Sequence, residues 1–157
     1  MYVIRLITAF DADRISRWRY PEPYATYNGD PASVRGLLDP RYNYHAVTDP
    51  DGVLVGYFCF GVDATVPAGR RLNLYAEDAL DVGLGMRPDL TGRGLGLDFV
   101  RAGLDFARKV YAPAAFRLTV ATFNQRAISV YERAGFKPAR TFGDRGAEWL
   151  LMRRPEE

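Results

Sequence analysis

The chain has 157 residues, 48% of them hydrophobic, which suits one domain with a substantial core but is too short for two ordinary domains. Its formal net charge is +2, and the 21 Lys and Arg residues are mixed with the 19 Asp and Glu residues, so we expect no nucleic-acid partner and no membrane partner. The single cysteine, Cys59, excludes an intrachain disulfide and has no companion at metal-ligand spacing, so no metal is expected.

The N-terminal segment predicts a strand, a helix and an aromatic loop. Residues 1–6 have the pattern of a short strand, and residues 11–18 that of a helix with Asp11 or Asp13 as its N-cap. Prolines in residues 18–31 forbid a regular helix. This loop carries four large aromatic residues, namely Trp18, Tyr20, Tyr24 and Tyr27. They either cap the core or line a pocket, and in the second case they are candidates for substrate binding.

A hairpin follows the loop. Residues 33–38 predict a further helical turn, and residues 44–48 and 53–60 predict two strands joined by the turn sequence DPDG. In this turn Gly52 occupies a position that needs a positive φ. The sequence therefore predicts that the two strands pair with each other.

A fourth strand is predicted over residues 79–86, after a loop rich in Pro, Gly and Arg around residues 67–71. Gly83 and Gly85 lie inside this strand. Glycines at such positions indicate a bulge or the close approach of a ligand.

The C-terminal half alternates helices with strands. Apolar residues recur at steps of three and four after Gly96, which predicts an amphipathic helix that ends before Pro113. Four further elements are expected, namely a strand at 116–121, a helix at 124–134 with Asn124 and Gly135 as caps, and a strand pair at 136–142 and 147–152. This order predicts a mixed α/β sheet with helices on its faces.

The sequence GMRPDLTGRGLGLDFV places three glycines at alternate positions, Gly92, Gly94 and Gly96, between a strand and a long helix. Unpaired N–H groups and the helix dipole at such a place bind phosphate, and glycines let the phosphate come close. The spacing excludes a dinucleotide fingerprint, and no Lys is present for a nucleoside-triphosphate loop. Taken alone, the loop could also be a tight turn.

The stretches MRPDLTGRGLG, FRLTVATFN and NQRAISVYERAGF together resemble the GNAT superfamily of N-acetyltransferases. The family pattern of Gln or Arg, two residues, Gly, one residue and Gly or Ala falls on Thr91, Gly94 and Gly96. This sequence departs from the pattern at Thr91, which lacks the long side chain usual there. The resemblance covers the chain from Ala79 onward.

The resemblance implies a single-domain α/β fold with a mostly antiparallel twisted sheet of about six to seven strands flanked by helices. It implies that the strands at 79–86 and 116–121 are splayed and hold the acyl-pantetheine arm of acetyl-CoA between them. It assigns to the cofactor the residues Leu84, Gly85, Met86, Thr91, Gly92, Arg93, Gly94, Leu95, Gly96, Asn124 and Tyr131. Arg93, Arg126 and Arg133 could each contact phosphates, and of these Arg93 is favoured, with a solvated surface charge as the alternative for each. A plain helix cap for Asn124 and a plain packing role for Tyr131 also stay open.

For catalysis, the resemblance places Tyr131 near the thioester sulfur, where a phenol can protonate the leaving thiolate. The attacking amine must be neutral, and Asp81 is the first candidate for the base, ahead of Glu77 and Asp78. Each carboxylate is equally consistent with a surface or turn position. His45, the only histidine, is a further candidate, and a structural role is the alternative for it.

The sequence thus predicts an acyl-CoA-dependent N-acetyltransferase that moves an acetyl group from acetyl-CoA to a primary amine of a small molecule or peptide by direct attack. The alternative is a module that binds acyl-CoA as a sensor or assembly element without turnover. The N-terminal residues lack a secretory-leader pattern and the chain has no long apolar run, so we expect a cytoplasmic protein. A homodimer is left open.

Overall fold

The computed structural model describes residues 1–157 with the exception of the side chain at position 144. Within this described part, seven strands form one sheet in the order β1-β2-β3-β4-β5-β7-β6. The strands are β1 (Val3–Leu6), β2 (Tyr44–Thr48), β3 (Leu54–Phe60), β4 (Leu80–Met86), β5 (Ala115–Ala121), β6 (Lys137–Asp144) and β7 (Ala147–Pro155). All neighbouring pairs are antiparallel apart from β4 and β5, which are parallel. The predicted fold class is confirmed.

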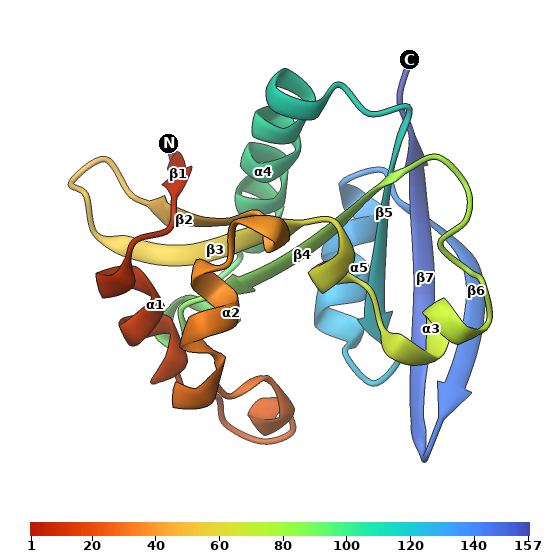
Figure 1. Ribbon diagram of the computed structural model, residues 1–157, viewed down its shortest axis with the longest axis horizontal. Helices are drawn as coiled ribbons and strands as arrows, with labels where there is room; N and C mark the ends of the chain where they lie inside the picture. Colours follow the sequence, from red (N-terminus) through yellow and green to blue (C-terminus); the bar gives the residue numbers. More distant parts are fainter.

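Helices cover both faces of this sheet (Figure 1). The helices are α1 (Ala9–Ser16), α2 (Val34–Leu38), α3 (Pro67–Arg71), α4 (Gly96–Tyr111) and α5 (Gln125–Arg133). Short 3-10 turns occur at Tyr24–Tyr27, Pro31–Ser33, Pro40–Tyr42, Val62–Ala64 and Pro88–Leu90. No described helix combines the length and apolarity that a bilayer crossing requires.

Each face of the sheet has its own apolar cluster, because side chains alternate along a strand. On the α4 and α5 face, Phe58, Phe60 and Phe99 belong to the main core, with Phe58 and Phe99 stacked at a centroid separation of 4.8 Å. On the opposite face, smaller clusters form under α1 and α2 and against α3. The sheet therefore has packed apolar side chains on both of its faces.

Several local predictions are confirmed. Gly52 has φ +84° in the hairpin turn and Gly135 has φ +98° after α5, which are the left-handed conformations expected at these positions. Asn124 is the N-cap of α5, and its side chain accepts a hydrogen bond from the Ala127 N–H at 3.1 Å.

Two local predictions are wrong. The cap of α1 is Thr8, not Asp11 or Asp13, because Thr8 and Asp11 form a reciprocal capping box in which each side chain accepts from the other's main-chain N–H. The segment at 67–71, expected as a loop, forms the short helix α3 with Pro67 in its first turn, where a missing N–H costs nothing.

The strands β4 and β5 pair only at Leu80 with Phe116 and at Asp81 with Arg117. Beyond these residues the two strands diverge, as Figure 1 shows in the centre of the sheet. This splay was predicted, and it opens a V-shaped gap that widens toward the C-terminal ends of both strands.

A buried ion pair joins the strands at the closed end of this gap. The Arg117 guanidinium donates to both carboxylate oxygens of Asp81, at 2.6 and 2.7 Å. Arg117 also donates to the Glu77 and Tyr75 carbonyls, and both charged residues are buried, at 4% and 8% exposure. The bond to Asp81 raises the pKa of Arg117. Because the pair has two aligned bonds and further acceptors, it fixes where the strands begin to separate.

We expect Asp81→Ala to lower the free energy of unfolding by about 3–5 kcal/mol, since it leaves the Arg117 charge buried without its partner. Urea unfolding followed by circular dichroism measures this change. The control is Asp13→Ala, which removes an exposed ion pair to Arg17 and should cost about 1 kcal/mol or less. Equal losses in the two variants would contradict the structural role of the buried pair.

Candidate active site

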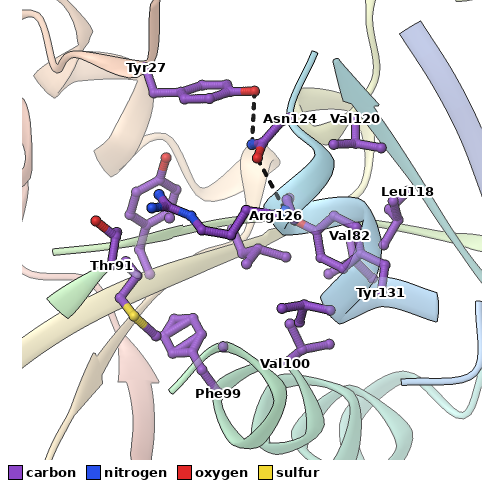
Figure 2. Close-up of a pocket in the computed structure, with 18 of the residues that line it drawn as sticks. Tyr27, Val82, Thr91, Phe99, Val100, Leu118, Val120, Asn124, Arg126 and Tyr131 are labelled. Atoms are coloured by element: carbon purple, nitrogen blue, oxygen red, sulfur yellow. Dashed lines mark hydrogen bonds between the residues drawn. The ribbon is translucent and has the colours of Figure 1, made fainter. Parts of the chain in front are cut away.

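The gap between β4 and β5 contains a cavity of about 590 Å³. Its walls come from both strands, from the loop before α4, from α5 and from the aromatic loop after α1. In Figure 2, Val82 of β4, Leu118 and Val120 of β5, and Phe99 and Val100 of α4 lie around this space. Secondary elements that are distant in the sequence thus form a single concave site, as is typical of ligand-binding pockets.

One edge of β4 faces this cavity with unpaired main-chain groups. Arg87 N–H donates to the Val55 carbonyl and Gly61 N–H to the Asp81 carbonyl, so the odd-numbered residues of β4 face β3. Since main-chain groups alternate between the two edges of a strand, those of Leu84 and Met86 point toward the gap. The Met86 carbonyl accepts a hydrogen bond from the Tyr20 hydroxyl at 2.6 Å. On this edge the Leu84 main-chain groups and the Met86 N–H have no strand partner, whereas the main chain of Gly85, which the resemblance also assigns to the cofactor, faces β3.

The glycines inside β4 do not mark a bulge, which was one of the two expected causes. The pairing of β3 with β4 is regular, without a bulge. A Cβ at Gly85 would lie 2.3 Å from the Tyr57 ring, and one at Gly83 would lie 2.6 Å from the Cys59 sulfur. Glycine is therefore needed so that side chains of the neighbouring strand can cross over β4.

The glycine-rich loop leads into α4 with its main-chain N–H groups free of the helix. Gly92 and Gly94 have φ of +71° and +77°, which favour glycine. The first helical hydrogen bond runs from Phe99 N–H to the Leu95 carbonyl, and no side chain caps the helix. The N–H groups of residues 96–98 therefore have no intrahelical acceptor. This geometry suits an anion, because the dipole of α4 adds positive potential at the same place.

Two residues of this loop differ in how they lie toward the cavity, since Thr91 lines it and Arg93 does not. The Thr91 hydroxyl donates to the Pro88 carbonyl at 2.7 Å, so it closes the turn of its own loop in place of the missing long side chain. Arg93 is not among the residues that line the cavity, whereas Arg126 and Arg133 of α5 are. The Arg126 guanidinium lies 4.3 Å from the centroid of the Tyr24 ring, and a Cβ at Gly92 would approach it to 3.0 Å. The cation beside the glycine loop is therefore Arg126.

Asn124 joins α5 to the aromatic loop. Its Oδ1 caps α5, and its Nδ2 donates to the Tyr27 hydroxyl at 3.2 Å, as Figure 2 shows. The residue thus holds two walls of the cavity together while its amide borders the interior.

Tyr131 extends from α5 into the cavity wall, near Leu118 and Val82 in Figure 2. Its ring packs edge-on against Phe136 at a centroid separation of 6.3 Å. Within the described residues its hydroxyl has no hydrogen-bond partner, and burial is the main cause that raises the pKa of Tyr131 above its usual range. The phenol is protonated at neutral pH and can donate that proton.

Three of the four aromatic residues predicted for substrate binding line the cavity, namely Tyr20, Tyr24 and Tyr27. Trp18 does not line it, because this side chain stacks on Tyr57 and packs in the cluster under α1 and α2. Tyr24 and Tyr27 both pack against Phe123 at the start of α5, at 6.1 and 6.0 Å. The aromatic loop therefore spans the opening from the β4 side to the α5 side.

The candidate bases lie away from the cavity. Both oxygens of Asp81 are engaged by Arg117, so its carboxylate is not free to take a proton, and the structure supports a structural role instead. His45 is buried between Phe60 and Phe106, and burial lowers its pKa. Glu77 is an exposed residue that lies 3.7 Å from Arg153.

Sequence reasoning missed a second group of lining residues on the face of the sheet that carries α1 to α3. They are Tyr44, Tyr57, Asp63, Ala64, Thr119 and Trp149. The alternation of side chains along the hairpin strands could have indicated on which face of the sheet Tyr57 lies. It could not have indicated that this face borders a cavity. Asp63 follows β3 in a 3-10 turn that the sequence pattern did not predict.

Residues 9–136 match the model of the acetyltransferase (GNAT) family. The chain belongs to this family. GNAT acetyltransferases use acetyl-CoA, which agrees with the cofactor predicted from the sequence. A comparison with curated proteins found no match.

Solved structures share the GNAT fold at low identity. An uncharacterized protein from Bacillus halodurans has a TM-score of 0.78 and 19% identity, over 98% of this chain and 83% of that one. AAC(6′)-Ib in complex with ribostamycin and coenzyme A has a TM-score of 0.74 and 18% identity, over 98% and 93%. A mutant of the spermidine N-acetyltransferase SpeG from Vibrio cholerae has a TM-score of 0.69 and 16% identity, over 98% and 94%. These likenesses support the fold alone.

Proposed function

We propose that this GNAT protein is an N-acetyltransferase that moves an acetyl group from acetyl-CoA to a primary amine of a small molecule or peptide by direct attack. The observation that carries the proposal is the cavity between β4 and β5, with the glycine loop at one end and the Tyr131 phenol in its wall. The spermidine and ribostamycin in the names of two structural neighbours are amines, which supports the same acceptor chemistry.

The residues around the cavity fit coenzyme A. The N–H groups at the start of α4 and the Arg126 guanidinium would bind its diphosphate. A Cβ added at Gly94 would have no protein atom within 4 Å, so there is room for a ligand at this glycine. The free edge of β4 at Leu84 and Met86 would pair with the amide groups of the pantetheine arm. Thr91, Gly92, Leu95 and Gly96 would line the phosphate end, and Gly85 and Asn124 the pantetheine end, whereas Arg93 lies outside the cavity wall.

When bound, acetyl-CoA supplies a thioester, from which the acetyl group passes to the amine while the CoA thiol leaves. As the C–S bond breaks, the Tyr131 phenol, which is protonated at neutral pH, would give its proton to the departing sulfur, and the proton lost by the new amide nitrogen would pass to water and restore the phenol. The Met86 N–H would donate a hydrogen bond to the carbonyl oxygen as negative charge develops there. Tyr20, Tyr24 and Tyr27 would bind the acceptor, since aromatic faces attract cationic amines.

A thiol-release assay with acetyl-CoA and a panel of primary amines tests the function. We expect amine-dependent release of free CoA, detected with a thiol reagent, and an acetylated product of matching mass. Saturable binding of acetyl-CoA in calorimetry without release on any amine would favour the sensor module instead.

We expect Gly94→Glu to weaken acetyl-CoA binding at least tenfold, because it brings a side chain and a negative charge to the phosphate end of the cavity. The matched control is Gly52→Glu. Gly52 has the same kind of backbone, with φ +84° against +77° for Gly94, and both positions have open space within 4 Å. Calorimetry on the two folded variants measures affinity. An equal affinity in both would show that the loop is only a turn.

We expect Tyr131→Phe to lower kcat about 100-fold without changing acetyl-CoA affinity, since a general acid contributes to the rate and not to cofactor binding. Because its folded pKa is raised, Tyr131 stays protonated as pH rises through neutrality, so the loss should be similar from pH 6 to about pH 9. Steady-state rates across this range measure the effect, with Tyr111→Phe, which lies outside the cavity, as control. Full turnover of Tyr131→Phe at every pH would refute the proton-donor role.

A further inference from the structure

The side of the cavity away from α4 and α5 contains one acidic group. Among the described residues that line the cavity, Asp63 is the only carboxylate, and Arg126 and Arg133 are the only basic residues. The two arginines come from α5, whereas Asp63 comes from the 3-10 turn Val62–Ala64 on the opposite face of the sheet. The cavity is therefore positive at the arginines, where the phosphates of the proposed cofactor would bind, and negative at Asp63. A cationic acceptor would be repelled from the arginines, and an anionic group would be repelled from Asp63.

Local structure fixes the turn that carries Asp63 over β4. The Gly61 N–H donates to the Asp81 carbonyl at 2.9 Å, and the Asn43 side chain donates to the Phe60 carbonyl at 3.0 Å. A Cβ at Gly83 would lie 3.2 Å from the Cβ of Ala64, so the absence of a side chain at Gly83 lets the turn pack closely on β4. Asp63 is thus placed by the main chain at the splayed strand.

The Asp63 carboxylate has one oxygen engaged and one available. The Tyr44 hydroxyl donates to its Oδ2. Its Oδ1 accepts no hydrogen bond from the described residues, and no described Arg or Lys pairs with this carboxylate. Tyr44 packs against Tyr57 at a centroid separation of 5.9 Å. A carboxylate oxygen without a hydrogen-bond partner, in one cavity wall with the Tyr44 and Tyr57 rings, is a combination that binds ammonium groups, through the ion pair and through cation–π attraction.

Tyr57 links this group to the proposed reacting end of the cavity. Burial is the main cause that raises the pKa of Tyr57, and Cys59, Tyr20, Tyr131 and Asp63 add to it through their charges. Tyr57, Tyr131 and Asp63 all line the same cavity. An acceptor that binds there with one amine at the proposed reacting end would therefore have Asp63 in the wall of its own binding site.

We propose that Asp63 binds a second, positively charged amino group of the acceptor, so that the enzyme prefers diamines to monoamines and amino acids of the same length. This inference rests on the proposed acetyltransferase function. A carboxylate next to an ammonium stabilises the protonated form, which would impede the attacking nitrogen. The same contact to a nitrogen that does not react costs nothing during attack and orients the acceptor. Asp63 is in this sense a positioning residue that sets specificity.

Three acceptors with the same four-carbon chain test the proposal, namely 1,4-diaminobutane, butylamine and 4-aminobutanoate. We expect the wild-type kcat/KM for the diamine to exceed that for butylamine about tenfold, with 4-aminobutanoate the poorest acceptor because its carboxylate faces Asp63. Asp63→Asn should bring the diamine to butylamine ratio close to one, mainly through KM, and should leave acetyl-CoA affinity unchanged. Tyr44→Phe keeps the carboxylate and should reduce the ratio less.

The control is Asp51→Asn, which makes the same charge change in the exposed DPDG turn outside the cavity and should keep the wild-type ratio. Thermal unfolding checks that each variant is folded. Turnover with no diamine preference in the wild type, or with an unchanged ratio in Asp63→Asn, would overturn this inference alone. Absence of turnover with every amine, despite acetyl-CoA binding, would overturn the proposed function and this inference with it.

Discussion

The pairing of β4 with β5 over only two residues determines the rest of the site. A parallel sheet that stayed paired would fill this space with its own hydrogen bonds, and no ligand could enter. The buried pair of Asp81 and Arg117 stabilises the closed end, since both charges are out of water and each satisfies the other. Beyond it, the main-chain edge of β4 is left unpaired and the cavity forms.

Divergence of the two strands exposes both faces of the sheet to one cavity. From the α4 and α5 face, the glycine loop, Arg126 and Tyr131 reach the gap, and from the opposite face Tyr57 and Asp63 reach it. A single splay therefore brings the glycine loop and Asp63, which are distant in the sequence, to the wall of one cavity. In the proposed reaction the cofactor and the acceptor enter from these two sides and meet between the strands.

The side chains that close the cavity lie in a loop whose sequence pattern does not predict their contacts. The aromatic loop has no regular structure beyond short turns, yet Tyr20 bonds to Met86 on β4 and Tyr27 bonds to Asn124 at α5. These two bonds tie the loop to both sides of the gap. Trp18, which precedes the first 3-10 turn of this loop, Tyr24–Tyr27, packs instead in the cluster under α1 and α2, because stacking on Tyr57 buries its large apolar surface.

Sequence alone determined the elements whose signals are local. The hairpin turn at Gly52, the stripe of α4, the Asn124 cap and the glycine loop each depend on residues a few positions apart, and all are present in the structure. The family resemblance added the splay and the cofactor. The sequence did not identify Thr8 as the cap of α1. Several polar residues near the start of this helix are suitable caps by residue type, and Thr8 is the cap because it forms two reciprocal hydrogen bonds with Asp11.

Only the tertiary structure decided which side chains meet. Asp81 had the residue type of a base, but both of its carboxylate oxygens bond to Arg117, which is 36 positions away. Arg126 and Asp63 line the cavity because α5 and the turn after β3 pack there. Secondary-structure propensity depends on neighbours along the chain. The composition of a site depends on which faces of helices and strands pack together, and long-range burial and strand pairing determine that packing.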